Sequence, residues 1–546
     1  MHQRTKIAVA VALALNTLTA FAQAQAEAEA PQRVEITGSR IRQVDLETAQ
    51  PVLKMTAQQI QATGLVTVGD VLNQLTSAGP PAFSKGSTLT SNREQGGQYI
   101  DMRGLGSQRL LVLVNGKRWT TTVAGYTDMS TVPTSMIERI DILKDGASSI
   151  YGSDAIAGVV NIVLKKSMQG PNLSVYHGQN DKGDGKNSDY SFSYGAGDEK
   201  ASLMFGLSHT TSGVVWSKDR DVTATTYGPN HPTDGLGVGQ WGRYRQVSAS
   251  GAATGVNQYL NHTGTWQNPN GVGQDSRNPA SYHAYAAGVD DLYNSTQQMM
   301  FESPNSLTTM FTKGTFELPM GVRFASTAMF SERNASRQNA GYPVNSLSQS
   351  KYPVYIDKNS YYNPIGASVT GGTGADAFFY RRMIEMPRVT DSKNQTIHID
   401  ASLEGDFTLR GLPWSCSTGY NHNAVTGLSS STGNLNLINL KKALGPSFLN
   451  SSGVVQCGTA ASPISLAECT PFNILGGPSA STPAALKYIA ANGQATYGST
   501  VNSITADVSG ELLTLPAGAM GETGGLERRE VPGYDIPDPL AQSNLR

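Results

Sequence analysis

The residues of this chain that could do chemistry are few and scattered. There are three cysteines and eight histidines in 546 residues. No GxSxG, HExxH or CxxC motif occurs, so no nucleophile elbow, zinc-protease helix or thiol pair is indicated. The segment NDKGDGKNS, residues 180–188, has the glycines and lysine of a phosphate loop but lacks the first glycine that such a loop requires. We therefore expect no catalytic residue, no metal and no cofactor.

The cysteines are better suited to a structural bond. Cys457 and Cys469 lie in one Gly-, Ser- and Pro-rich stretch and could close a loop disulfide, which leaves Cys416 alone. Metal binding is the weaker alternative, because no histidine cluster lies nearby. A disulfide fits an exported protein.

The first residues predict export. Arg4 and Lys6 precede an apolar stretch at residues 7–18, and small-x-small cleavage sites follow. Residues 1–26 are therefore expected to be a signal peptide, with an uncleaved anchor as the alternative. No later run of about eighteen apolar residues occurs. If the mature chain lives in a membrane, it must do so as a closed barrel.

The composition favours one small domain and one large barrel. Apolar residues make up 38% and charged residues 15%, with 58 glycines and a net charge of −1. A nucleic-acid binder would show a basic excess and a disordered chain a high net charge, so both classes are disfavoured.

Residues 51–168 have the pattern of an α/β domain. A helix capped by Thr56 leads to an apolar stripe of Val68, Val71, Leu72 and Leu75. The strand LLVLV then runs into Asn115-Gly116, which favours a hairpin turn. Two further strands are expected at residues 137–143 and 159–164, around a short helical turn. The stripe should pack on the hairpin.

Residues 169–546 alternate apolar with small polar side chains in about nine strands. Tyr190, Phe192 and Tyr194, for example, alternate with serines before a turn at Gly197. In a soluble sandwich the apolar faces would meet in a core, whereas in an outer-membrane barrel they face lipid. Short turns alternate with long stretches at residues 212–304, 336–392 and 426–499. This asymmetry favours the barrel.

The motifs MRGLGSQRLLVLVNGKRW and IERIDILKDGASSIYGSDAIAGVVNIVLKK resemble the plug domain of TonB-dependent outer-membrane receptors. The resemblance covers residues 50–166 in order. It implies a membrane β-barrel of about 22 strands, here incomplete, with an N-terminal α/β plug domain, in the outer membrane of a Gram-negative bacterium. Departures are LKDG at residues 143–146, where many relatives have Gly-Pro, and a polar end without a terminal aromatic residue.

The resemblance also implies roles for particular residues. The charges of Arg103, Glu138 and Arg139 would face the inner barrel wall and hold the plug releasably, since buried charges need partners. Backbone turns in the plug would be provided by the following residues: Gly104, Gly106, Asn115, Gly116, Gly146, Gly152 and Gly158.

Residues 27–50 form a linker with a segment similar to a TonB box. Its residues are Val34, Glu35, Ile36, Thr37, Gly38, Ser39 and Arg40. TonB, driven by the inner-membrane proton-motive complex, would pair with this segment as an added strand. Without the family context, a plain spacer has equal weight.

The implied function is energy-coupled uptake of a scarce siderophore, vitamin, oligosaccharide or peptide, without chemistry on the substrate. The long loops are rich in Tyr, Asn and Gly and carry little charge, which favours a saccharide or a neutral peptide as the substrate. Alternatives are a signal-transducing receptor, for which too few residues precede Val34, or a structural or adhesive barrel. Since about nine strands cannot make 22, we expect a truncated copy. Its partners would be TonB, outer-membrane lipid and the small-molecule, saccharide or peptide substrate, with no nucleic acid.

Overall fold

A computed structural model describes most of the chain. The described residues are 34–35, 42–43, 52–63, 65, 67–80, 93–145, 147–198, 200–231, 237–265, 271–286, 291–346, 352–516 and 518–545. The expected signal peptide at residues 1–26, residues 36–40 of the TonB-box-like segment and Gly146 lie outside them. Val34 and Glu35 form β1 (Val34–Glu35), which pairs with β2 (Arg42–Gln43).

The plug is a small α/β domain built on a five-stranded sheet with the order β3-β6-β7-β4-β5. Its elements are β3 (Val52–Thr56), α2 (Ala57–Ala62), α3 (Val68–Asn73), η2 (Ser107–Arg109), β4 (Leu110–Val114), β5 (Lys117–Arg118), η3 (Met129–Thr131), η4 (Thr134–Met136), β6 (Ile137–Leu143), α4 (Ser148–Tyr151), η5 (Ser153–Ala155) and β7 (Gly158–Leu164). The strands expected from the sequence at residues 137–143 and 159–164 are β6 and β7.

Local sequence signals explain these elements. Thr56 caps α2 in a reciprocal capping box with Gln59. Asn115 and Gly116 have φ values of 49° and 76°, the left-handed conformation that the tight β4–β5 turn requires. Gly158 also has positive φ, and a Cβ there would lie 2.4 Å from the Leu143 carbonyl oxygen. Only glycine fits where β7 starts beside β6.

The plug has its own apolar core. Val68, Val71 and Leu72 are buried in one cluster with residues of β4, β6 and β7, and Leu75 packs against it. The apolar stripe therefore packs on the hairpin strand, as the sequence predicted. Burial of these apolar side chains makes the main favourable contribution to the folding free energy of so small a sheet.

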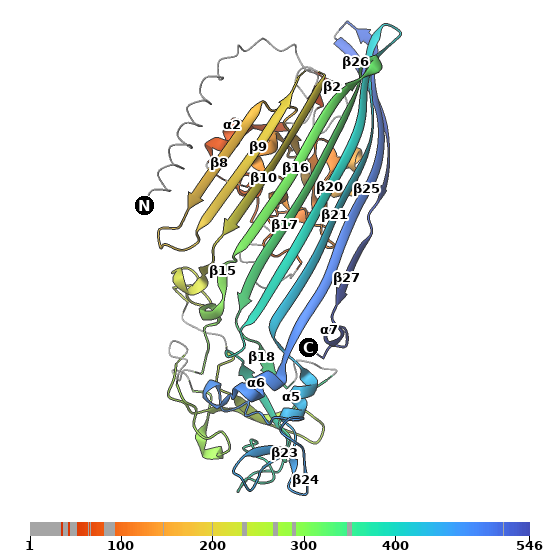
Figure 1. The fold of residues 1–546 in the computed structure, drawn as a ribbon. Helices are drawn as coiled ribbons and strands as arrows, with labels where there is room; N and C mark the ends of the chain where they lie inside the picture. Colours follow the sequence, from red (N-terminus) through yellow and green to blue (C-terminus); the bar gives the residue numbers. More distant parts are fainter. Residues whose placement is uncertain are drawn as a thin grey trace, which may run out of the picture.

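A tall antiparallel sheet of ten strands follows the plug in the chain (Figure 1). Strands that are neighbours in the sheet follow one another in sequence order, from β8 to β26. The short strand β27 pairs with residues 495–499, near the start of β25. The strands are β8 (Gly170–Gly178), β9 (Asn187–Gly197), β10 (Ala201–Ser212), β16 (Asn305–Leu318), β17 (Val322–Asn339), β20 (Arg388–Leu409), β21 (Leu412–Leu435), β25 (Ala490–Leu515), β26 (Gly518–Glu530) and β27 (Gly533–Pro537). In the described part of the chain β8 and β26 do not pair, so the barrel is open between them.

The two faces of this sheet differ in chemistry. On β20, Ile397, Ile399 and Leu403 point outward and are exposed, while His398 and Asp400 point inward and are buried. Leu203, Phe205 and Leu207 repeat the outward pattern on β10. An apolar outer face and a polar inner face are the arrangement of a membrane barrel and the reverse of a soluble sandwich.

The long strands extend well beyond the lipid-facing band. β25 has 26 residues, whereas a tilted strand crosses the membrane in about 9–11. The connections are accordingly shorter than predicted, at residues 213–304, 340–387 and 436–489. The sequence misplaced these boundaries because outward residues beyond the band, such as Glu332 and Lys393, face water and need no apolar character.

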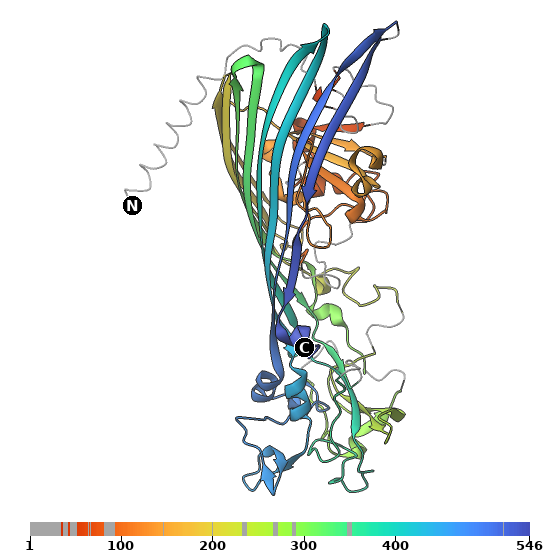
Figure 2. The ribbon, with the colours of Figure 1, turned by 90° about the vertical axis from the view of Figure 1, so that its right-hand side faces the viewer.

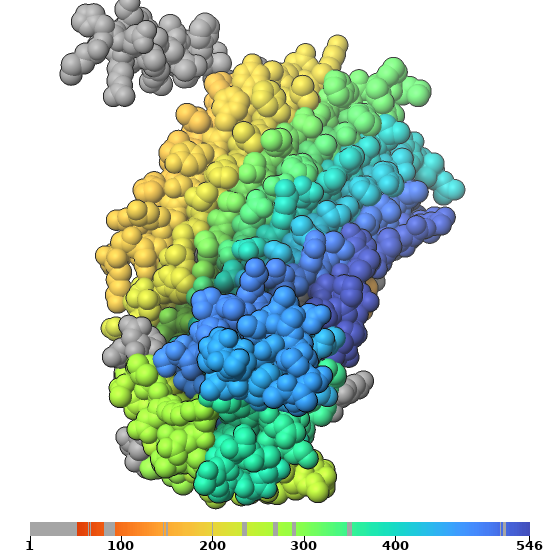
Figure 3. Space-filling view, turned by 60° about the horizontal axis from the view of Figure 1, so that its bottom comes forward, coloured from red at the N-terminus to blue at the C-terminus, as the bar shows by residue number. Residues whose placement is uncertain are grey.

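The three long connections fold together at one end of the sheet into what we call the loop domain. Figure 3 shows the connections in contact there. Its elements are β11 (Val215–Trp216), η6 (Ser217–Asp219), β12 (Arg243–Val247), β13 (Ala253–Leu260), η7 (Pro279–Ser281), β14 (Tyr282–Ala284), η8 (Ser295–Gln298), β15 (Met300–Glu302), β18 (Pro343–Asn345), β19 (Ala377–Arg382), α5 (Leu437–Ala443), β22 (Ser447–Leu449), β23 (Val455–Thr459), β24 (Ser462–Pro463), η10 (Pro478–Ala480) and α6 (Pro483–Ile489). The loop domain has its own buried core, to which all three connections contribute. At the other end of the sheet, the β16–β17 turn contains η9 (Pro319–Gly321). On the side of the loop domain, α7 (Pro539–Gln542) follows β27 (Figure 1).

The plug lies against the concave face of the sheet (Figure 2). It is closer to the end of the sheet with the short turns than to the end with the loop domain. Within the described residues, no helix is both long and apolar enough to cross a bilayer.

Candidate functional site

The β4–β5 hairpin of the plug meets the inner wall of the sheet. β5 is the edge strand of the plug sheet, so the residues after the Asn115-Gly116 turn face outward from the domain. The Lys117 ammonium lies 2.6 Å from Asp400 Oδ1 on β20. Asn421 and Asn423 on β21 donate hydrogen bonds of 3.0 and 2.9 Å to the Arg118 carbonyl oxygen. Two neighbouring strands, β20 and β21, thus hold one hairpin.

The Arg118 side chain continues this contact toward the last strands. Its guanidinium lies 2.8 Å from Asp154 in the plug and 3.8 Å from Glu527 on β26. Burial and the neighbouring positive charge of Arg529 lower the pKa of Arg118, with burial the larger cause. An arginine so placed needs its carboxylate partners, because an unpaired buried charge is costly.

A second contact lies closer to the loop domain. Arg333, a buried residue of β17, forms an ion pair with Asp128 of the plug and also donates to the Ser130 hydroxyl. Asp128 in turn accepts from the Gln98 backbone N–H at 3.1 Å. Gln95 Nε2 donates a 2.9 Å hydrogen bond to the Thr390 carbonyl oxygen on β20. The wall therefore fixes the plug segment that faces the loops.

A third contact joins the plug to the far end of the chain. Arg93 pairs with Asp535 of β27 at 2.5 Å and lies 4.9 Å from the ring centroid of Tyr497 on β25. The Tyr497 hydroxyl donates to Asn394 Oδ1 at 2.6 Å.

The charges expected at the wall from the sequence form ion pairs and hydrogen bonds inside the plug, and Glu138 also acts electrostatically on Lys313 of the wall strand β16. Among the described residues, Arg103 hydrogen-bonds the carbonyl oxygens of Ile156 and Ala157, and Arg139 pairs with Glu138 and Asp141 at 3.2 and 3.1 Å. The wall is met by Arg93, Lys117, Arg118 and Asp128. Sequence reasoning missed these because it took LLVLVNGKRW as core and turn and did not ask where the residues after the turn point.

The predicted turn residues lie where the backbone bends. Gly104, Gly106, Gly152 and Gly158 have positive φ, as Asn115 and Gly116 do. The Asn115 side chain also accepts from the Leu164 N–H at 2.9 Å, which ties the hairpin turn to β7.

A polar cavity of about 110 Å³ separates part of the hairpin from the wall. Small hydroxyl and glycine residues of β20, β21 and β25 line it opposite Asn115, Gly116 and Lys117, among them Ser402, Ser415 and Gly419. Within the described residues, no group of three or more His, Cys, Asp or Glu side chains has the geometry to hold a metal ion.

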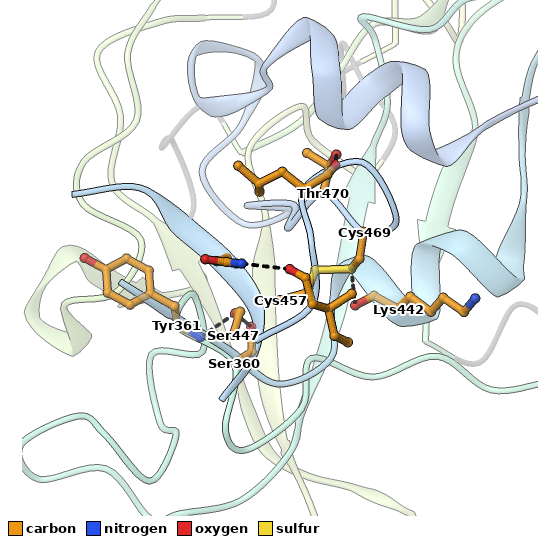
Figure 4. The surroundings of a disulfide bond; sticks show 10 residues. Ser360, Tyr361, Lys442, Ser447, Cys457, Cys469 and Thr470 are labelled. Atoms are coloured by element: carbon orange, nitrogen blue, oxygen red, sulfur yellow. Dashed lines mark hydrogen bonds between the residues drawn. A yellow bond between two sulfur atoms is a disulfide. The ribbon is translucent and has the colours of Figure 1, made fainter. Parts of the chain in front are cut away.

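Two features give the loop domain a fixed shape. Cys457 and Cys469 form a disulfide, the pair that the sequence favoured, and Cys416 is free. Figure 4 shows the bond beside Lys442, whose carbonyl oxygen lies 3.6 Å from Cys469 Sγ. Arg381 is fully buried among the three connections and pairs with Glu385 at 2.5 Å. Burial lowers the pKa of Arg381, while Glu385 opposes that shift.

Comparison with known proteins identifies the plug. Residues 44–159 match the TonB-dependent Receptor Plug Domain family model. Among solved structures, the chain is similar to the ferric-catecholate import receptor Fiu of E. coli K12 (13% identity, TM-score 0.37), which it matches over 89% of its own length and 66% of that chain. It is also similar to FpvA of P. aeruginosa (11% identity, TM-score 0.39, 92% and 55%) and to the siderophore receptor PiuA of Acinetobacter baumannii (12% identity, TM-score 0.35, 90% and 63%).

The chain thus spans between 55% and 66% of the length of these three structures. The assignment of the plug rests on the family match. The sheet whose concave face holds the plug has an apolar outer face and a polar inner face. Residues 44–159 are therefore a TonB-dependent receptor plug domain, and the sheet that lies beside this domain has the strand pattern of an outer-membrane β-barrel.

Proposed function

We propose that the protein takes up a scarce nutrient by energy-coupled displacement of its plug. The observation that carries this proposal is the manner of docking. The plug is held on the wall by three sets of polar contacts, centred on Lys117–Asp400, Asp128–Arg333 and Arg93–Asp535. Apolar contact with the wall is limited to a few residues, among them Met204 and Phe311. Polar contacts can exchange with water, so a pull can separate them without exposing a large apolar surface.

TonB would supply the pull. The segment from Val34 to Arg40 precedes β3, the edge strand of the plug sheet opposite the wall-bound hairpin. An added strand from TonB would bind this segment by backbone hydrogen bonds. This uptake needs no chemical reaction on the substrate. The proposed function is therefore that of a transporter and not of an enzyme.

The first test is genetic. Deletion of the gene in the source bacterium should abolish growth on one limiting nutrient, tested over iron-siderophore complexes, cobalamin, oligosaccharides and peptides. The wild-type gene should restore growth, and a variant without residues 34–40 should fail to do so at equal membrane level. Loss of growth only under iron limitation would contradict the lean toward a saccharide or peptide. Unchanged growth in every medium would contradict uptake.

The second test immobilises the plug. Gln95→Cys and Thr390→Cys, placed together in a Cys416→Ser background, can be joined by a short bismaleimide because these positions are in contact. The joined protein should lose uptake and keep substrate binding. Each single cysteine treated with the same reagent is the control. Undiminished uptake by the joined protein would show that this part of the plug does not move.

A further inference from the structure

An apolar cavity of about 240 Å³ lies in the loop domain. The connection 340–387 contributes residues of β18 and β19 to its wall, and the connection 436–489 contributes residues of α5. The lining includes Tyr342, Val344, Tyr352, Phe379, Leu437 and Leu440. None of the described residues that line the cavity carries a charge. Since an apolar protein cavity of about 150 Å³ can hold benzene, this one has room for a larger ring.

Two tyrosines of the lining each have a cation over the ring. The guanidinium carbon of Arg388, at the start of β20, lies 4.5 Å from the Tyr342 ring centroid, and the Lys441 ammonium lies 5.0 Å from the Tyr352 ring centroid. Tyr342 is exposed, so the cavity reaches the surface beside this ring. In the described part of the chain, no carboxylate pairs with either cation. Charge of one sign at the edge of an apolar cavity favours a ligand of the opposite sign.

A second arginine adds to the positive charge beside Tyr342. Arg382 of β19 is only 4% exposed, and its Nε has no hydrogen-bond partner. Its Nη1 donates a 3.0 Å hydrogen bond to the Gly341 carbonyl oxygen, and Arg388 Nε donates one of 2.7 Å to the neighbouring Ala340 carbonyl oxygen. Burial and the positive charge of Arg388 lower the pKa of Arg382, with burial the larger cause. Two guanidinium groups on adjacent carbonyls repel one another, and an anion beside them would relieve that cost.

We propose that the loop domain binds a small organic anion, a carboxylate with an apolar ring, whose ring fills this cavity and whose carboxylate meets Arg388. The hydrogen bond to Ala340 uses only Nε of Arg388, so its two terminal nitrogens can bind a carboxylate. Lys441 is exposed and adds a second positive charge to the edge of the cavity.

The composition of the loops favoured an uncharged substrate because it averages over three connections, whereas these cations gather at one cavity. A neutral ring could enter the same space, but it would gain nothing from Arg388 and Lys441. The inference rests on the proposed function in taking the bound anion to be the transported substrate.

The test is calorimetric titration of the full chain in detergent micelles with naphthoate, a fused-ring carboxylate, and with naphthamide, its uncharged counterpart. The heat from micelles without protein is subtracted. Naphthoate should bind at one saturable site, and about tenfold more tightly than naphthamide, the effect of one charge-assisted hydrogen bond. This comparison uses the wild-type protein and depends on no variant.

Three variants locate the site. Arg388→Met should weaken naphthoate binding by about tenfold, to the affinity of naphthamide, and leave naphthamide binding unchanged. Arg277→Met is the matched control, because Arg277 also covers a tyrosine of the loop domain, 4.6 Å from the Tyr361 ring centroid, but does not line the cavity. It should bind both compounds as the wild type does. Val344→Phe fills the cavity and should abolish the binding of both.

Equal affinities of the two compounds for the wild type would overturn the inference, and so would unchanged naphthoate binding by Arg388→Met. Deletion of the gene separates this inference from transport. Naphthoate binding as expected, without a growth defect in any medium, would refute only the transport proposal. A growth defect, together with a wild-type protein that does not bind naphthoate, would refute only the anion site.

Discussion

Arg93 of the plug and Asp535 of β27 form an ion pair at 2.5 Å although 442 residues separate them in the chain. Arg93 Nε donates to the second carboxylate oxygen at 3.0 Å, so the contact is bidentate. The pair connects the plug segment nearest the loops to the last strand of the described sheet.

Removal of this pair should weaken plug docking. Arg93→Met removes the ion pair and the contact with Tyr497, and we expect a loss of about 1–2 kcal/mol, since the carboxylate is partly exposed. Asp535→Asn keeps the ring contact and should cost less. The measurement is a urea unfolding curve of the protein in detergent micelles. Equal losses for the two variants would show that the contact with Tyr497 contributes nothing.

The outward face of the sheet should reject charge within the lipid band. Ile399→Arg places a guanidinium among the exposed apolar residues of β20 and should cost about 2–4 kcal/mol, with less protein recovered in the outer membrane. Gln395→Arg is the matched control on the same strand and face, where Glu332 lies 2.8 Å from the native side chain. Equal recovery of the two variants would place the band elsewhere on the strand.

The disulfide should stabilise the loop domain and leave the plug unaffected. Replacement of Cys457 and Cys469 by serine removes a short cross-link, at a cost of about 3 kcal/mol. Trypsin should then cut faster after Lys442, whose carbonyl oxygen lies beside the bond. Trypsin should cleave the Cys416→Ser variant at the wild-type rate, because this cysteine is free and lies on β21. Unchanged cleavage in the double variant would mean that the apolar core alone holds the segment.

The loop domain should lose stability in strong alkali. Burial raises the pKa of Tyr293 to about 12, opposed in part by Arg382. The folded state therefore favours the neutral phenol, and its stabilising effect is complete below about pH 10 and lost as the pH rises toward about 12. The full effect is on the order of 2–3 kcal/mol. Tyr293→Phe should reduce the pH dependence of thermal melts between pH 9 and 12, and Tyr282, whose pKa burial also raises, should account for part of what remains. A variant that melts with the wild-type slope would contradict the assignment.

The sequence predicted the local elements because their signals are local. Thr56 with Gln59 sets the start of a helix, Asn115-Gly116 sets a turn, and the alternation from Tyr190 to Tyr194 sets a strand with one lipid-facing side. Each depends on residues within a few positions of one another. The plug motif added the family, since its order of glycines and apolar residues covers a whole domain.

The wall contacts could not be read in this way. Lys117 and Asp400 are 283 residues apart, and no spacing in the chain indicates that they meet. The expectation named Arg103, Glu138 and Arg139, and it did not include Lys117 and Arg118, which the position of β5 at the plug's edge brings to the wall. The loop domain was missed for the same reason, because its core draws on three connections separated by long strands.

By itself, then, the sequence determined the plug and the two-faced strands, since periodicity and turn chemistry act over short distances. The export signal at residues 1–26 stays a prediction. Only the tertiary structure decided which charges of the plug and the wall face one another and how the loops share a core. These depend on strand register and sheet curvature, which place distant residues within a few ångströms and follow from the packing of the whole chain.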